Sequence, residues 1–197
     1  QEFFSTDELV SAFDLANVHR SPARFDYAKL ENMNGHYMRG TADAELTDAL
    51  VATLPYLSNG AALAASSDPA LKDKLLRAMA GLKERAKTLA ELADGAQFLV
   101  AQRPLPMDVK ASDILAKGGH GHLAALLPRL TALAEWSAVS TDAAVRAYAE
   151  ETGTKLGQAA QPLRAALTGR STSPGIFDVL DVLGREESLG RIADQAR

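Results

Sequence analysis

The chain has 197 residues, a formal net charge of −4 at pH 7 and 47% hydrophobic residues, which is typical of a globular protein with a sizeable core. Its lack of cysteine excludes disulfides and thiolate metal sites. No apolar stretch is long enough to span a membrane, and no signal peptide is visible. Because the first residue is Gln1 and not Met, we expect the start to be a cut in a longer protein or a processed end.

The first half of the chain has the pattern of short helices, since alanine and leucine dominate and β-branched clusters are scarce. Ser5-Thr-Asp-Glu8 is a capping box that starts a helix through about Phe13. A break follows at Ser21–Asp26. The next predicted helices cover residues 27–39, 43–57, 68–82 and 89–100. Asp68-Pro69 opens the third of these helices, which has Leu71, Leu75, Met79 and Leu82 on one face and Leu76 alongside.

The second half repeats this pattern between two loops, the linker Arg103-Pro-Leu-Pro106 and Gly118-Gly-His-Gly121. The first predicted helix here covers 122–139, where Pro128 can kink it, and the second is capped by Thr141 and ends at Gly153. A third helix covers 155–168. The fourth has Ser173 as N-cap and Pro174 in its first turn and ends at Gly184, and a last helix covers 186–196. The expected fold is therefore all-α, a helical bundle or helical cage in two or three subdomains.

Two stretches are locally basic although the whole chain is acidic. No acidic side chain occurs from Thr152 to Phe177, which carries Lys155, Arg164 and Arg170. Residues 71–90 hold six basic side chains against two acidic ones. A polyanion responds to the local field and not to the net charge, so these stretches indicate a nucleic-acid partner.

Several motifs, in order along nearly the whole chain, resemble bacterial glutamyl-tRNA synthetases. Phe25-Asp-Tyr-Ala-Lys-Leu30 with Asn34-Gly-His-Tyr-Met-Arg39 is similar to the family pattern FD..KL.W.N..YIR, although Asn32 stands where the family usually has tryptophan. Further similar segments are 82–92, Trp136, Lys155-Leu-Gly157, 161–169 and 173–180. The ordered set is more specific than any lone motif.

The resemblance implies a C-terminal piece of such a synthetase. Residues 1–49 would be the end of the stem-contact region, 50–97 the first helical anticodon-binding subdomain, and 98–197 the second. The parent enzyme joins glutamate to tRNA-Glu with ATP and Mg²⁺. Neither a HIGH-type nor a KMSKS-type motif occurs here. The chain is thus expected to be inactive alone, with no cofactor of its own and its catalytic domain upstream. The expected state is a cytoplasmic monomer that binds tRNA-Glu, with neither DNA nor membrane as partner.

The same resemblance implies roles for individual residues. Arg85 lies where discriminating members read the last anticodon base and favour C over G. Lys29 and Arg39 would touch the tRNA stem. The first two anticodon bases would meet Arg146, Arg164, Ser173, Pro174, Ile176 and Phe177. A helix start at Ser173 would offer free backbone N–H groups, and Phe177 a surface for base stacking.

The residues alone leave other interpretations open. Arg85, Lys29 and Arg39 have the pattern of solvated charges on helices. Arg164 can instead cap its own helix, and Ile176 and Phe177 have the spacing of core residues. Trp136 is expected to anchor helices. His120 and His122 lack a third ligand, so no metal site is predicted. The rival functions are a helical protein-interaction module and a paralogue with altered tRNA specificity.

Overall fold

The computed structural model describes residues 2–18, 24–66 and 68–196, and these residues form helices without any strand. The predicted all-α class is therefore confirmed. The predicted break at Ser21–Asp26 is described only from Arg24 onwards, and its first three residues lie outside the described part. No helix in the described ranges is long and apolar enough to cross a bilayer.

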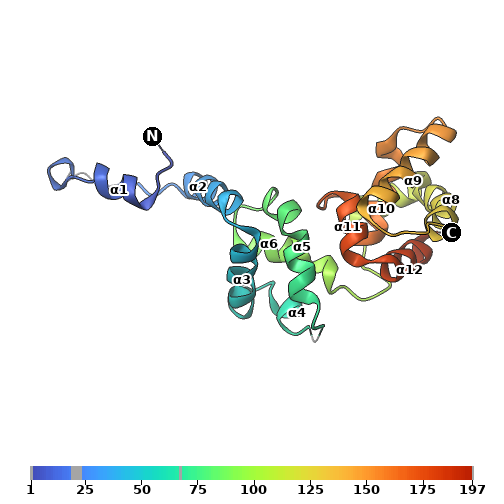
Figure 1. Ribbon diagram of the computed structural model, residues 1–197, viewed down its shortest axis with the longest axis horizontal. Coiled ribbons are helices and arrows are strands. Elements are labelled where there is room, and N and C mark those ends of the chain that lie inside the picture. Colours follow the sequence, from blue (N-terminus) through green and yellow to red (C-terminus); the bar gives the residue numbers. More distant parts are fainter. Residues whose placement is uncertain (1, 19–23, 67, 197) are drawn as a thin grey trace.

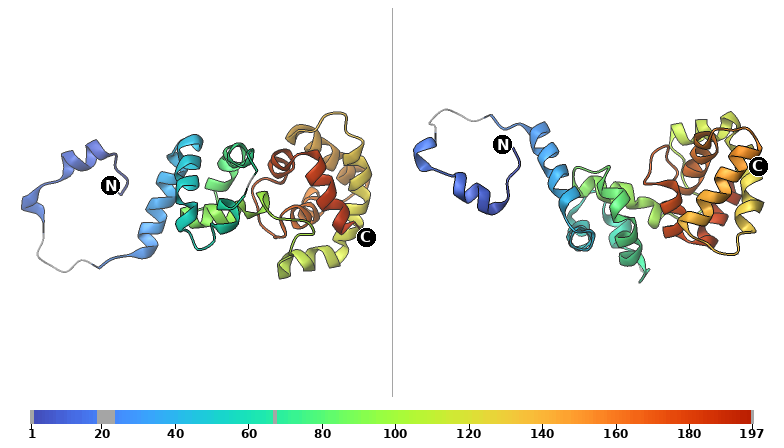
Figure 2. Two further views of the ribbon diagram at one scale, coloured as in Figure 1. Left: turned by 90° about the horizontal axis from the view of Figure 1, so that it is seen from below. Right: turned by 45° about the horizontal axis from the view of Figure 1, so that its top comes forward.

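The described chain is elongated, with three parts along its longest axis (Figures 1 and 2). At one end, α1 (Thr6–Ala12) begins with the predicted capping box, in which Ser5 Oγ accepts from the Glu8 amide. A short 3₁₀ turn, Leu15–Asn17, follows. Then α2 (Tyr27–Gly40) leads into the middle of the molecule and contacts α5.

The middle part, here called the first helical group, covers residues 43–99. It comprises α3 (Asp43–Thr53), the 3₁₀ turn Leu54–Tyr56, α4 (Ala61–Ala64), α5 (Leu71–Lys83), α6 (Leu89–Ala96) and the 3₁₀ turn Gln97–Leu99. The four predicted apolar positions of α5 are buried, while Leu76 is 38% exposed. Burial of each such side chain contributes about 1.5–3 kcal/mol, so this face attaches α5 to α3 and α6.

The second helical group covers residues 109–195. It comprises α7 (Val109–Ile114), the π turn Leu115–Gly119, α8 (His120–Thr131), α9 (Ala138–Glu151), α10 (Leu156–Thr168), α11 (Ile176–Leu183) and α12 (Arg185–Gln195). Helix α10 is central, since it contacts α7, α8, α9, α11 and α12. Its small and apolar residues, such as Ala159, Leu163 and Leu167, are fully buried and allow this close packing.

Several predicted helix boundaries are wrong. Helix α8 starts inside the predicted loop at His120, because the turn is confined to Lys117, with ψ of 34°, and Gly118, with φ of 102°. It ends at Thr131 and not at Val139. Ser137 caps α9 by accepting from the Ser140 amide, whereas Thr141 is buried and donates back to the Ser137 carbonyl. Asp68 lies ahead of α5, where its carboxylate accepts from the Ala70 amide and from Lys74.

A fully buried arginine joins the two helical groups. Arg191 of α12 is 2% exposed. Its guanidinium donates to three backbone oxygens, those of Leu167 at 2.6 Å, Phe98 at 2.9 Å and Ala101 at 3.1 Å. Glu187 accepts from its Nε at 2.6 Å. Burial lowers the pKa of Arg191, and the hydrogen bond that Arg191 donates to Glu187 opposes this effect. The charge is thus compensated by carbonyls from both groups.

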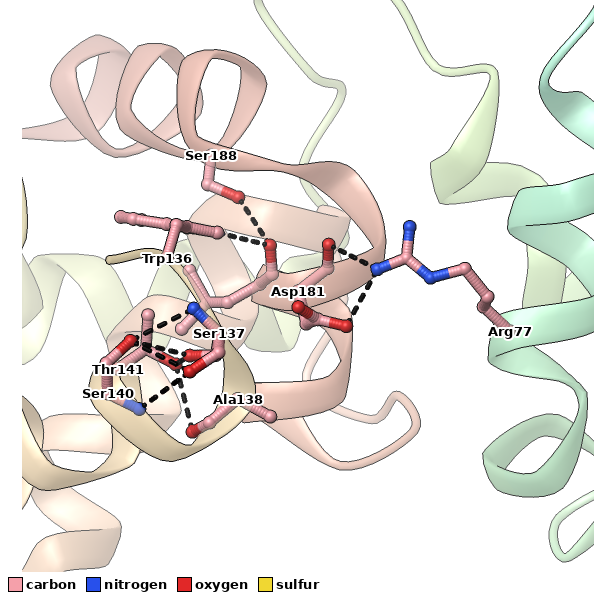
Figure 3. A network of polar contacts seen from close by, with 9 residues as sticks. Arg77, Trp136, Ser137, Ala138, Ser140, Thr141, Asp181 and Ser188 are labelled. Carbon is pink, nitrogen blue, oxygen red and sulfur yellow. Dashed lines mark hydrogen bonds and ion pairs between the residues drawn. The ribbon is translucent and has the colours of Figure 1, made fainter. Parts of the chain in front are cut away.

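A second polar contact joins α5 to α11 (Figure 3). Arg77 Nη2 donates to the Asp181 carboxylate at 2.7 Å and to the Asp181 carbonyl at 3.0 Å. The preceding carbonyl, that of Leu180, accepts from Trp136 Nε1 at 3.0 Å and from Ser188 Oγ at 3.3 Å. These donors reach carbonyls in the last turn of α11, where the Leu180 carbonyl also accepts from the Gly184 amide at 3.1 Å. Trp136 is therefore an anchor between helices, as predicted.

We expect Arg191→Met to lower the free energy of unfolding by about 3 kcal/mol, because three carbonyls and Glu187 lose their donor in a buried site. Urea denaturation of the chain measures this loss. The exposed pair of Lys117 with Asp113 supplies the control, since Lys117→Gln removes a solvated charge and should change stability by less than about 0.5 kcal/mol. Equal effects of the two substitutions would contradict the role of Arg191.

Candidate nucleic-acid interface

A pocket of about 360 Å³ lies between the two helical groups. The first group supplies the end of α5, the turn after it and one face of α6, with Leu82, Arg85, Ala86, Glu91, Asp94 and Gly95. The second group supplies the end of α10 and the loop that follows, with Thr168, Arg170, Thr172, Ser173 and Pro174. Phe98 completes the lining. The pocket lining thus combines charged, hydroxyl and apolar side chains.

Most of the basic excess predicted for residues 71–90 is paired with acidic residues from other segments. The ion pairs are Lys72–Asp48 at 2.6 Å, Lys74–Asp68 at 2.8 Å, Arg77–Asp181 at 2.7 Å and Lys83–Asp43 at 2.7 Å. Within the described ranges, the exposed Arg85 side chain makes neither an ion pair nor a hydrogen bond. Arg85 is therefore a charge that the fold leaves available at the pocket.

A second arginine, Arg164 of α10, lies beside this pocket. Its half-buried side chain donates from Nε to Ser173 Oγ at 2.9 Å, and no carboxylate of the described residues pairs with it. Burial lowers the pKa of Arg164, and repulsion from Arg85 adds to the effect. The two guanidinium groups are thus close enough to repel each other, and neither makes an ion pair with a carboxylate of the described residues. A bound phosphate or an electron-rich base edge would relieve this repulsion.

The third cation of the acid-free stretch is opposed in space. Arg170 makes a bidentate pair with Asp94 of α6, with Nη1–Oδ2 of 2.5 Å and Nη2–Oδ1 of 2.7 Å. Its hydrogen bonds lower the pKa of the Asp94 carboxyl. The expectation of three unopposed cations between residues 152 and 177 is therefore wrong for Arg170, because Asp94 is 76 residues away in the sequence.

Ser173 and Pro174 do not form the predicted helix start. Helix α11 begins at Ile176 with Gly175 as its N-cap. The buried Ser173 hydroxyl accepts from Arg164 and donates to the Pro174 carbonyl at 2.8 Å. Ser173 therefore orients the Arg164 side chain, whereas the sequence predicts that it would begin a helix with free backbone N–H groups. Pro174 is buried against α5, where a Cβ on Gly81 would lie 2.9 Å from the Pro174 Cβ.

The remaining predicted contact residues do not line this pocket. Ile176 is 4% exposed in the core, and the half-buried Phe177 packs against it. Arg146 is exposed on α9 and paired with Asp142 at 2.8 Å. On α2, Lys29 is exposed and pairs with Glu2 at 3.2 Å, and Arg39 is exposed near the helix end. The structure therefore brings together Arg85, Arg164, Ser173 and Pro174.

The histidines considered as possible metal ligands, His120 and His122, make hydrogen bonds within the second helical group. His120 Nδ1 is 2.6 Å from the Gln195 carbonyl, and His122 Nδ1 is 2.8 Å from the Tyr148 hydroxyl. In the part of the chain that the structure describes, no three His, Asp or Glu side chains gather into a metal site.

Sequence reasoning missed Asp94 and Gly81. Asp94 is one acidic residue on an amphipathic helix, and nothing local marks it as the partner of Arg170. Gly81 carries a weak signal, because glycine inside a helix costs about 1 kcal/mol and often marks close packing.

Comparison with known proteins agrees with this geometry. The anticodon binding domain family matches residues 45–196. Glutamate–tRNA ligase 1 of Beijerinckia indica subsp. indica is 62% identical over all of this chain, and that of Methylobacterium sp. (strain 4-46) is 60% identical. The chain spans only 41% and 42% of these relatives. The crystal structure of a glutamate tRNA ligase from Elizabethkingia meningosepticum in complex with its amino acid superposes with a TM-score of 0.77. It is 25% identical over the whole of this chain and 37% of that one.

The helical fold is that of an all-α domain of the anticodon-binding class. The chain belongs to the anticodon binding domain family, and the similar region of its relatives is the C-terminal part of bacterial glutamate–tRNA ligases.

We expect Ser173→Ala to lower the free energy of unfolding by about 1 kcal/mol, because the half-buried Arg164 loses its hydrogen-bond acceptor. Chemical denaturation measures the change. Thr172→Ala is the matched control, since Thr172 is a neighbouring exposed residue of the same loop and should show almost no effect. A destabilisation by the control as large as that of Ser173→Ala would refute this role.

Proposed function

We propose that this chain recognises the anticodon of tRNA-Glu within a glutamate–tRNA ligase. The observation that carries the proposal is a pair of arginines without ion-pair partners among the described residues, Arg85 in the pocket lining and Arg164 bonded to Ser173 beside it, in a chain of net charge −4. Single-stranded RNA offers phosphates and unstacked base edges, and arginine can bind either through its planar fork.

Arg85 is proposed to read the last anticodon base. A guanidinium has only N–H donors, so it needs acceptors on the base. The pairing edge of cytosine presents O2 and N3 as neighbouring acceptors, whereas that of guanine presents mainly N–H donors. An arginine held at the pocket therefore favours C over G at this position.

The proposed contacts with the first two bases differ in how the fold supports them. Arg164 and Ser173 are supported by their mutual hydrogen bond beside the pocket, and Pro174 by its place in the lining. Arg146 and Phe177 would have to act outside this lining, and Ile176 through its small exposed fraction. Lys29 and Arg39 are proposed to contact the tRNA stem from the exposed surface of α2.

The whole ligase is proposed to join glutamate to tRNA-Glu with ATP and Mg²⁺, as a monomer in the cytoplasm. We assign none of the residues of this chain to ATP or Mg²⁺, because it contains neither a HIGH-type nor a KMSKS-type motif. Its contribution is to bind and orient the anticodon arm. We propose residues 1–49, 50–97 and 98–197 as its three functional divisions.

We expect Arg85→Gln to relax the preference for C over G at the last anticodon base, because an amide offers an acceptor as well as donors. The ratio of affinities for anticodon stem-loops with C or G should fall by about tenfold, within the 1–3 kcal/mol of a good base contact. Arg129→Gln, on α8 and outside the pocket lining, is the control.

An unchanged ratio in Arg85→Gln would refute the role of Arg85. Affinity for RNA that is insensitive to salt would instead indicate a protein-interaction module, since phosphate contacts make binding fall steeply with salt. Wild-type affinity for other tRNAs equal to that for tRNA-Glu would indicate altered specificity.

A further inference from the structure

The two walls of the pocket belong to different helical groups, and one ion pair crosses between them. Asp94 on α6 and Arg170 after α10 form two parallel hydrogen bonds, a geometry that fixes both distance and angle. Both side chains line the pocket that contains Arg85. The pair is half-exposed, so its role in overall stability is small compared with that of a buried contact.

A second contact of the same walls lies at Gly81 and Pro174. A side chain at position 81 would come within 2.9 Å of the Pro174 Cβ, so α5 and the loop touch through backbone and ring. Arg85 lies four residues after Gly81, in the turn that follows α5, and Ser173 lies next to Pro174 and three residues after Arg170. The side chains proposed to read bases are thus flanked by the residues that join the walls.

We propose that Asp94 and Arg170 are positioning residues that set the selectivity of this pocket for the last anticodon base. The proposal rests on the proposed function of Arg85. The bidentate pair holds the α6 wall at a defined separation from the loop that carries Ser173 and orients Arg164. Gly81 sets the same separation on the α5 side by allowing Pro174 to approach.

Selectivity depends on this separation more steeply than affinity does. A hydrogen bond to a base edge weakens sharply when its distance or angle departs from the optimum. Attraction between arginine and phosphate falls only slowly with distance. A loosened junction should therefore lose discrimination between C and G while keeping most of its attraction for RNA. Loss of the Asp94 charge should also increase attraction for any RNA, since it removes an acidic group from the pocket.

The pair is intact at neutral pH. The hydrogen bonds that Arg170 donates lower the pKa of Asp94. The stabilisation that the ionised carboxylate gives to the pair is therefore present above the ordinary aspartate pKa, and it is lost only as the pH falls through the lowered value. Binding measured at pH 7 consequently tests the pocket with the Asp94–Arg170 pair formed.

The test uses the 197-residue chain and two anticodon stem-loops that differ only in C or G at the last anticodon base. Asp94→Asn and Arg170→Asp should each lower the ratio of the two affinities by about threefold or more. Asp94→Asn should keep or increase affinity for the G stem-loop. The exchange of charges in Asp94→Arg with Arg170→Asp should restore most of the ratio, as a double-mutant cycle would show. Gly81→Ala should lower it without any change of charge.

Unfolding measurements on each variant separate positioning from folding, and Asp94→Asn with Gly81→Ala carry the test if a charge reversal alone prevents folding. The proposal is overturned if Asp94→Asn and Gly81→Ala fold and bind both stem-loops with the wild-type ratio. It is also overturned if they weaken both affinities equally, as a merely structural role would. A wild-type chain that binds but does not prefer C would refute Arg85 as the reader, and a chain that binds neither stem-loop would refute the proposed function itself.

Discussion

The buried guanidinium of Arg191 is the interaction on which the relation of the two helical groups depends. A charge that is 2% exposed is stable only if nearby groups replace its water. Here the carbonyls of Phe98, Ala101 and Leu167 do so, and they come from the end of the first group, the linker and α10. Because these carbonyls must converge on one planar group, the linker and both groups are held in one arrangement, and the pocket lies where they meet.

Charge pairing then determines what the pocket offers to a ligand. Four basic side chains of the α5 region are neutralised by aspartates from elsewhere, and Arg170 is neutralised by Asp94. Arg85 and Arg164 are left without an acidic partner in the described part of the chain, and their mutual repulsion favours an anionic or electron-rich ligand. Carboxylates from distant segments therefore pair with most of the cations around α5, while Arg85 at the pocket keeps no such partner among the described residues.

Much of the fold was predictable because it depends on local patterns. The stripe that contains Leu75 and Met79 is spaced for one helical face, and the positive φ values of Gly153 and Gly184 at helix ends match their predicted roles. The errors lie where two local signals compete. Ser137 and Thr141 are both good caps by residue type. Ser137 is the one that caps α9, directly after Trp136, whose ring N–H is bonded to the Leu180 carbonyl of α11. Ser173 has the signature of a cap, yet its hydroxyl is bonded to Arg164 and to the Pro174 carbonyl.

The sequence by itself determined the all-α class, the family resemblance and the prominence of Arg85, because periodicity, caps and ordered motifs are encoded over short distances. Only the tertiary structure decided which cations remain free and which side chains share a pocket. Arg170 and Asp94 are 76 residues apart, and Arg77 and Asp181 are 104 residues apart. No local pattern contains either pairing, because each exists only after the helices have packed and have brought the opposite charges within hydrogen-bond distance.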